Sequence, residues 1–150
     1  NNNLYGFVDF NQLPEEPIAE KISYKNGIAI PKYHLCRICG TCISKDKVRS
    51  TVTLLTTTGT VNVKFRKEYF SLFDKQISEK GEDGVKHVVE KSWFNRGSMI
   101  IVNGMRSGDT FISKKYASTN GHQLYKINGL LDDGRLIIQS ERYKGTMEDD

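Results

Sequence analysis

The strongest constraint on the fold is a side-chain period of two that recurs along the first half of the chain. In residues 60–66 every second residue is apolar and those between are polar. Residues 50–56 are rich in threonine and alternate less strictly, with Val52 and Leu54 on one side and Thr51 and Thr53 on the other. This period places successive side chains on opposite faces of a β-strand. With a third segment at residues 35–43, the pattern predicts a three-stranded meander over 34–66. The residues expected to be buried, here and in a later strand, are Val52, Leu54, Val61, Val63, Phe65, Ile100 and Val102. The residues expected to face outward are Thr53, Asn62 and Lys64.

The period changes after the third strand. In residues 67–79 apolar residues recur at spacings of three and four, which predicts a helix with one buried face. A strand is expected at residues 98–102, then a polar loop at 105–121, then two strands at 122–127 and 135–140. Many short strands with one helix after the third favour a small barrel. The last two strands are interpreted as one final strand folded into a hairpin. The predicted fold class is mainly β, a five-stranded OB-fold barrel in the order β-β-β-α-β-β.

The N-terminal part of the chain differs in composition. Residues 1–33 contain all three prolines, which cannot donate to a ladder and restrain their predecessors, so an extended N-terminal arm is expected. Asn26 and Gly27 form a turn signal within it. The predicted organisation is therefore an arm over 1–33, an OB-fold domain over 34–143 and a flexible acidic tail over 144–150.

Composition limits the environment and the partners. The chain has 150 residues with a net charge of +4, a mild bias towards anionic partners such as nucleic acid. No apolar stretch approaches the roughly 20 residues of a membrane span, and no signal-peptide pattern opens the chain, so no membrane partner is expected. The three cysteines are clustered and odd in number, a poor disulfide framework. A reducing, cytoplasmic location fits them best.

The cysteines also raise the question of a zinc site. Cys36, Cys39 and Cys42 follow His34 at metal-like spacings. Zinc prefers four ligands in a tetrahedron, and strong signatures use two separated pairs of ligands. Here all the ligands lie along one expected strand, with Cys39 on the face opposite Cys36 and Cys42. Core packing is the favoured interpretation, and neither a metal nor another cofactor is predicted.

The chain carries no recognisable catalytic constellation. Its paired carboxylates, such as Asp132 and Asp133, lie in expected turns or in the tail, where they favour the local backbone. The histidines are scattered, and the glycines form no phosphate loop. We therefore expect a non-catalytic domain or fragment.

Several segments together resemble a known family, the OB-fold near the C-terminal end of bacterial DNA polymerase III alpha subunits. The resemblance covers roughly residues 10–140 as a pattern. The segments that carry it are Cys36–Lys47, Thr51–Thr56, Gly59, Val61–Phe65, Trp93–Gly97, Gly104 and the leader Phe10–Pro17. The resemblance implies a domain that contacts the single-stranded template. It does not imply polymerase activity, because the chain lacks the catalytic parts of such an enzyme.

Basic residues interleaved with aromatic ones mark the expected binding surface. OB-folds bind through the face of their second and third strands and two flanking loops. Cations follow the phosphates, and aromatic faces stack bases. The candidate nucleic-acid-binding residues are Lys45, Lys47, Arg49, Lys64, Arg66, Arg106, Phe111, Lys114, Lys115 and Tyr116.

The sequence thus predicts a single-stranded DNA-binding module of a replicative polymerase of the III alpha type. The alternative is a protein-interaction barrel that docks other replication subunits. A hydrolase or transferase is a third and weaker candidate. DNA versus RNA, base preference and oligomeric state stay open at this point.

Overall fold

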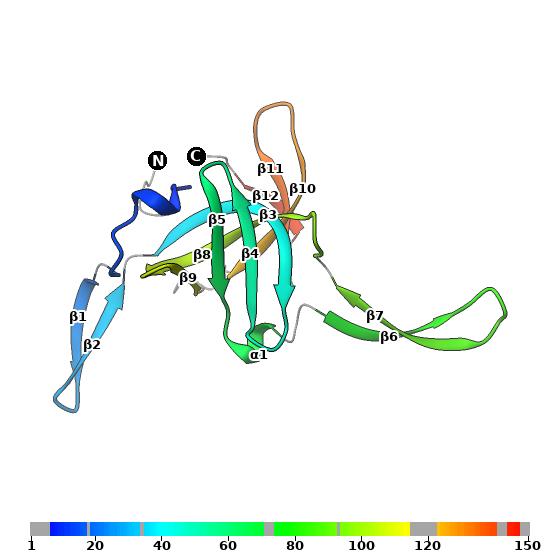
Figure 1. Ribbon diagram of the computed structural model, residues 1–150, viewed down its shortest axis with the longest axis horizontal. Coiled ribbons are helices and arrows are strands. Elements are labelled where there is room, and N and C mark those ends of the chain that lie inside the picture. The colour runs from blue at the N-terminus through cyan, green and yellow to red at the C-terminus, as the bar shows by residue number, and fades with distance from the viewer. Residues whose placement is uncertain are drawn as a thin grey trace.

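The computed structural model describes residues 7–17, 19–33, 35–70, 74–92, 94–114, 123–140 and 144–147. Its central feature is a closed five-stranded barrel (Figure 1). The barrel strands are β3 (Cys36–Asp46), β4 (Thr51–Thr56), β5 (Gly59–Lys64), β8 (Met99–Ser107) and β9 (Thr110–Ser113).

The strand order identifies the topology of the barrel. The strands pair in the order β3-β4-β5-β9-β8, and β8 pairs back onto β3 to close the ring. All neighbours are antiparallel except β5 and β9, which are parallel. An order of 1-2-3-5-4 with a parallel pair between strands three and five is compatible with an OB-fold. The predicted fold class, a mainly β protein built on a five-stranded barrel, is confirmed.

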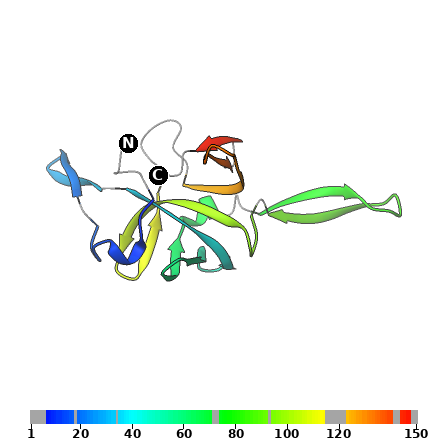
Figure 2. The ribbon, with the colours of Figure 1, turned by 90° about the horizontal axis from the view of Figure 1, so that it is seen from above.

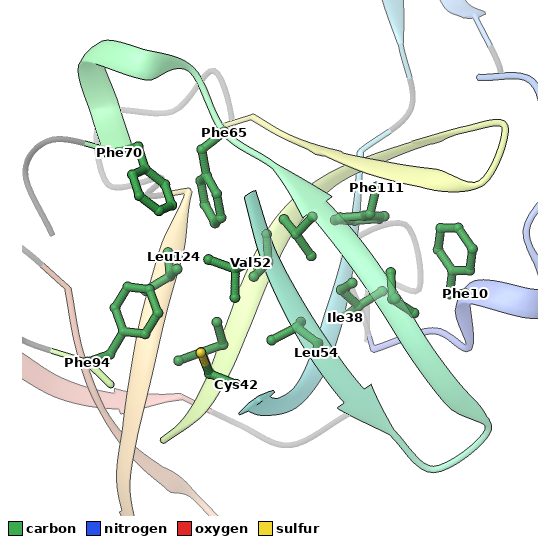
Figure 3. Close-up of a cluster of buried hydrophobic side chains, with 14 residues drawn as sticks. Phe10, Ile38, Cys42, Val52, Leu54, Phe65, Phe70, Phe94, Phe111 and Leu124 are labelled. Carbon is green, nitrogen blue, oxygen red and sulfur yellow. The ribbon is translucent and has the colours of Figure 1, made fainter. Parts of the chain in front are cut away.

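The core confirms the predicted register of the barrel strands. All seven residues expected inside are at most 4% exposed, and Asn62 and Lys64 lie on the outer surface with Thr53 half-buried. Aromatic rings close the two ends of this core (Figure 3). At one end the Phe10 ring meets Phe111 edge-on, with centroids 6.4 Å apart. At the other the Phe70 ring lies 6.0 Å from Phe65.

The barrel closes at Gly104. This residue of β8 pairs with Cys36 of β3 on one side and with Ser113 of β9 on the other. A Cβ at position 104 would lie 2.1 Å from the carbonyl oxygen of Ile112, far inside van der Waals contact. Gly40 of β3 is similar, since its Cβ would lie 2.9 Å from the Leu55 carbonyl oxygen. Both strands bend closely over their neighbours where only glycine fits.

The predicted helix at residues 67–79 is wrong over most of its length. Helix α1 covers only Lys67–Phe70, and a strand, β6 (Asp74–Lys80), follows it. β6 pairs along its whole length with β7 (Lys86–Ser92) in an antiparallel hairpin. One turn of helix is enough to place Phe70 in the core. After Phe73 the chain pairs with β7 as a strand, although the spacing of its apolar residues is also compatible with a helix. Phe73, part of the apolar pattern, lies outside the described residues.

The fifth barrel strand also differs from the prediction. It is β9, inside the segment expected to be a polar loop over 105–121. The two strands expected to complete the barrel instead extend the sheet outward from β8, in the order β10, β11, β12. These strands are β10 (Leu124–Leu130), β11 (Leu136–Gln139) and β12 (Lys144–Met147). β9 has only four residues, too few for a period of two to stand out from its polar surroundings.

The N-terminal segment contributes a hairpin and, before it, an irregular segment over residues 7–13 that lies against the barrel and that we call the strap. Phe7 forms a bridge to Arg37 of β3, and the short 3₁₀ turn η2 (Phe10–Gln12) follows. Beyond the strap, β1 (Ala19–Lys25) and β2 (Ile28–Tyr33) form a hairpin. Figures 1 and 2 show this hairpin and the β6–β7 hairpin projecting from the barrel in opposite directions.

The close approach at Gly104 leads to a stability prediction. Gly104→Ala should lower the free energy of unfolding by about 1–3 kcal/mol, because its methyl group must displace backbone atoms of β9. Gly129→Ala is the matched control, since its Cβ would meet only the tip of the Ile137 side chain, at 3.3 Å. Urea unfolding measures both. Equal effects of the two substitutions would contradict this account of barrel closure.

Candidate nucleic-acid interface

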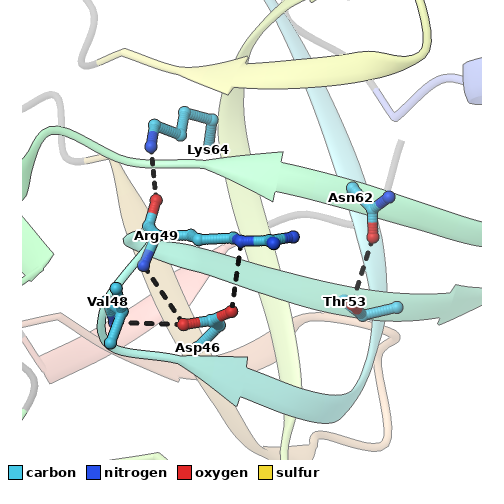
Figure 4. Close-up of polar contacts among 6 residues, drawn as sticks. All are labelled: Asp46, Val48, Arg49, Thr53, Asn62 and Lys64. Carbon is cyan, nitrogen blue, oxygen red and sulfur yellow. Dashed lines mark hydrogen bonds and ion pairs between the residues drawn. The ribbon is translucent and has the colours of Figure 1, made fainter.

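The turn between β3 and β4 is built around one carboxylate (Figure 4). Asp46 Oδ1 accepts hydrogen bonds from the backbone N–H groups of Val48, at 3.0 Å, and Arg49, at 3.1 Å. Its other oxygen lies 3.9 Å from Nε of Arg49. The end of β5 docks onto the same turn, because Lys64 Nζ donates to the carbonyl oxygen of Arg49. An aspartate that accepts bonds from turn N–H groups stabilises the backbone of the turn that carries Lys47 and Arg49.

This end of the barrel gathers four of the predicted cations. We call Lys47, Arg49, Lys64 and Arg66 the basic end; Lys47 and Arg49 come from the β3–β4 turn, and Lys64 and Arg66 from the end of β5. All four residues are exposed, and the side chain of Arg49 is 81% exposed despite its ion pair. The backbone N–H of Phe65 bonds to the Ser50 carbonyl at 2.9 Å, which holds the two segments together.

Lys114 lies beside this group. It is exposed and follows β9, whose Ile112 pairs with Lys64. The outer face of β4 and β5 next to it is uncharged and carries both polar side chains and one apolar side chain. There Thr53 Oγ1 donates to Asn62 Oδ1 at 3.1 Å, and Leu55 is 50% exposed. The surface therefore combines cations at one end with uncharged hydrogen-bonding groups along the strands.

Two of the predicted binding cations have structural contacts instead. Lys45 Nζ donates to the Phe94 carbonyl at 3.1 Å and lies 4.5 Å from the centroid of that ring. Arg106 donates from Nη1 to the carbonyls of Phe10, at 3.1 Å, and Leu13, at 2.9 Å, and from Nε to that of Gly108, at 2.7 Å. Its guanidinium also lies 4.4 Å from the Phe10 ring centroid. Both cations are committed to protein contacts, so we leave them out of the interface.

Phe111 is a clear correction. The sequence placed it in an exposed loop as a stacking platform, but it lies on β9 with its side chain 0% exposed in the barrel core. A ring enclosed by the core has no face to offer a base. Lys115 and Tyr116 lie outside the described residues. An exposed aromatic that the sequence analysis did not select is Tyr24, 74% exposed near the turn of the β1–β2 hairpin. The Asn26–Gly27 turn signal could have directed attention to it.

The cysteine cluster divides between two faces of β3, as predicted. Cys36 and Cys42 are buried on the barrel side, and Cys39 is half-buried on the other face. Burial raises the pKa of the Cys36 thiol to about 11 and also raises the pKa of Cys42, where the charge of Lys45 partly opposes the effect. Within the described residues, no three histidine, cysteine or acidic side chains are placed to hold a metal, and His34 lies outside them.

Comparison with known proteins links the chain to DNA polymerases. It is 37% identical over 139 residues to the probable DNA polymerase YorL of Bacillus subtilis strain 168, and equally to a DNA-directed DNA polymerase of Bacillus phage SPbeta. The match covers 92% of this chain but only 11% of each relative. No family model matches the chain, and no solved structure matches it. The chain is thus related to a small segment of proteins named as DNA polymerases, in agreement with the polymerase part of the resemblance.

One further observation bears on the environment. No helix in the described part of the chain has the length and apolar character that crossing a membrane requires.

The contacts of Arg106 predict a structural rather than a binding effect. Arg106→Ala should lower the free energy of unfolding by about 2–3 kcal/mol, because three carbonyls lose a charged donor and the strap loses its anchor. Thermal or urea unfolding measures the loss, with Arg66→Ala, at an exposed position, as the control. A destabilisation no larger than that of the control would show that the strap does not depend on this side chain.

Thiol accessibility tests the placement of the cysteines. At pH 8 a pKa of about 11 leaves on the order of one Cys36 thiol in a thousand ionised, so alkylation of the folded chain should be slow there. Cys42 should also be protected, and Cys39 should react first. Mass spectrometry after a timed maleimide pulse measures the order, with the urea-unfolded chain as the control in which all three react. Faster labelling of Cys36 than of Cys39 would contradict the assignment of faces.

Proposed function

We propose that this chain is a single-stranded DNA-binding module of a DNA polymerase, of the III alpha type that its sequence resembles, and that it has no catalytic activity of its own. The observation that carries the proposal is the basic end, where the β3–β4 turn and the end of β5 bring four exposed cations together at one end of the barrel. The relationship to DNA polymerases supports DNA as the ligand. The clustered free thiols favour a reducing, cytoplasmic setting.

The arrangement suits a phosphate backbone. Binding by cations near the ends of strands two and three would agree with OB-folds, which bind through the face of these strands and two flanking loops. The neutral face of Thr53 and Asn62 beside them offers hydrogen bonds without repelling an anion. Each phosphate contact releases counterions, so binding of this kind is strong at low salt and weakens steeply as salt rises.

The contacts of the acidic residues support a non-catalytic role. Asp46, Asp83 and Asp133 each accept a bond from a backbone N–H two residues further along the chain. For Asp133, the backbone N–H and then the guanidinium of Arg135 hold the pKa of the carboxyl below its usual value. These three carboxylates serve turns at separate places on the surface, so they do not form a paired acid and base.

Salt-dependent binding tests the proposal. A fluorescent oligothymidylate should bind the chain with an affinity that falls steeply with salt. Lys47→Ala, Lys64→Ala and Arg66→Ala should each weaken binding and reduce the slope of log affinity against log salt by about 0.7. Lys86→Ala, at an exposed position in the β6–β7 hairpin, is the matched control and should leave the slope unchanged.

The competing function predicts a different result. A barrel that docks other replication subunits would show oligonucleotide binding that is weak and equally affected by all four lysine and arginine substitutions. That outcome would replace DNA binding by protein docking. Primer extension or hydrolysis by the purified chain that is lost on a point substitution would overturn the non-catalytic part of the proposal.

A further inference from the structure

The β1–β2 hairpin is a defined ribbon outside the barrel core. Its strands pair from Ala19 opposite Tyr33 to Lys25 opposite Ile28. Asn26 and Gly27 turn the chain with φ values of 54° and 76°, the left-handed conformation that two-residue hairpin turns require. Figures 1 and 2 show the ribbon standing clear of the barrel, with its tip at the far end.

Large apolar side chains are exposed on both faces of this ribbon. Residues directly opposite each other in a hairpin share a face, so Tyr24 lies with Ala29, and Lys25 lies with Ile28. Tyr24 is 74% exposed, Ile28 67% and Ile22 55%. A two-stranded ribbon has no second layer to bury them, and such ribbons are only marginally stable in water. The exposed apolar side chains of the ribbon are therefore available to contact a ligand.

Charge distinguishes this ribbon from the β6–β7 hairpin. Residues 19–33 contain three lysines and one glutamate, a net charge of +2, and Lys25 is exposed at the tip. Residues 74–92 of the β6–β7 hairpin contain four lysines and five acidic residues, a net charge of −1. Both hairpins project from the barrel and have a glycine with positive φ at the turn, Gly27 and Gly84. Only the β1–β2 hairpin combines positive charge with an exposed aromatic ring among the described side chains.

We infer that the tip of the β1–β2 hairpin is a second contact for single-stranded DNA, separate from the basic end. The Tyr24 ring stacks on an unpaired base, with Ile22 on the same face of the ribbon. On the other face Lys25, with Ile28 opposite it, contacts a phosphate of the same strand. The ribbon is a single layer of two strands about 4.8 Å apart, so it is narrow, and a nucleic acid strand that passes around its tip can contact both faces. Base stacking on an aromatic ring tolerates any base, which fits a sequence-independent contact. The inference rests on the proposed function in taking DNA as the ligand.

Substitutions at the two hairpin tips test this inference in the full 150-residue chain. Tyr24→Ala should weaken binding of a fluorescent oligothymidylate roughly 5- to 100-fold with little change in salt slope, as expected for a lost stacking partner. Tyr24→Phe should retain most of the affinity because the ring remains. Lys25→Ala should reduce the salt slope by about 0.7. Val85→Ala, 54% exposed at the other tip, is the control and should bind like the unsubstituted chain. Because Tyr24 is exposed, its substitutions should leave the thermal unfolding curve unchanged.

A crosslinking measurement separates this inference from the proposed function. A photoreactive phenylalanine analogue at position 24 should crosslink to the oligonucleotide, and the same analogue at position 85 should not. Loss of binding on Arg66→Ala with no effect of Tyr24→Ala and no crosslink from position 24 would overturn the hairpin contact and leave the basic end intact. Weaker binding of Tyr24→Ala, with no effect of substitutions at the basic end, would overturn the basic end as the binding site and leave the hairpin contact intact. Crosslinking from position 24 to protein in place of DNA would overturn the inference in favour of a docking arm.

Discussion

The architecture depends on the parallel pairing of β5 with β9, because this contact turns an open sheet into a barrel. β9 reaches β5 because it follows β8 and pairs with it on the side away from β3. The pairing on both sides of β8 meets at Gly104, which is opposite Cys36 of β3 and opposite Ser113 of β9. A side chain at this position would occupy the space of the Ile112 backbone. The closed ring buries the seven alternating residues of its strands, and it also fixes where each loop leaves the barrel.

Closing the ends of the barrel determines which cations remain for a ligand. The strap brings Phe10 over Phe111, and Arg106 secures it by bonding to carbonyls in the strap and in the adjacent turn. At the opposite end Lys45 is anchored to Phe94. A phosphate that recruited either cation would have to replace hydrogen bonds already satisfied within the fold, at a cost to stability. The four residues of the basic end differ in being exposed at the surface, where Lys64 donates to one carbonyl and Arg49 lies beside the Asp46 carboxylate.

The sequence predicted the parts of this structure that are encoded by local periodicity. Alternation identified β3, β4 and β5, because one buried face fixes the register of a strand. A continuous apolar run located β8, which is buried on both faces. Reasoning from periodicity failed at residues 74–80. Their apolar spacing predicted a helix, but they form a strand because they pair with β7. The same reasoning also failed at Phe111, whose burial depends on a strand of four residues paired with β5 nearly fifty positions earlier. Likewise, Arg106 contacts a residue 96 positions away, a relationship that no local pattern contains.

The positions of the two hairpins explain how the fold can carry contacts beyond the barrel. One lies before β3 and the other between β5 and β8, so neither interrupts the pairs that close the ring. Each hairpin is held by its own cross-strand bonds and turn, and its length or surface can therefore change without moving Gly104 or the core. The barrel then acts as a rigid support for the basic end, whereas the hairpins extend its reach. The opposite net charges of the two hairpins imply that they extend it towards chemically different surroundings.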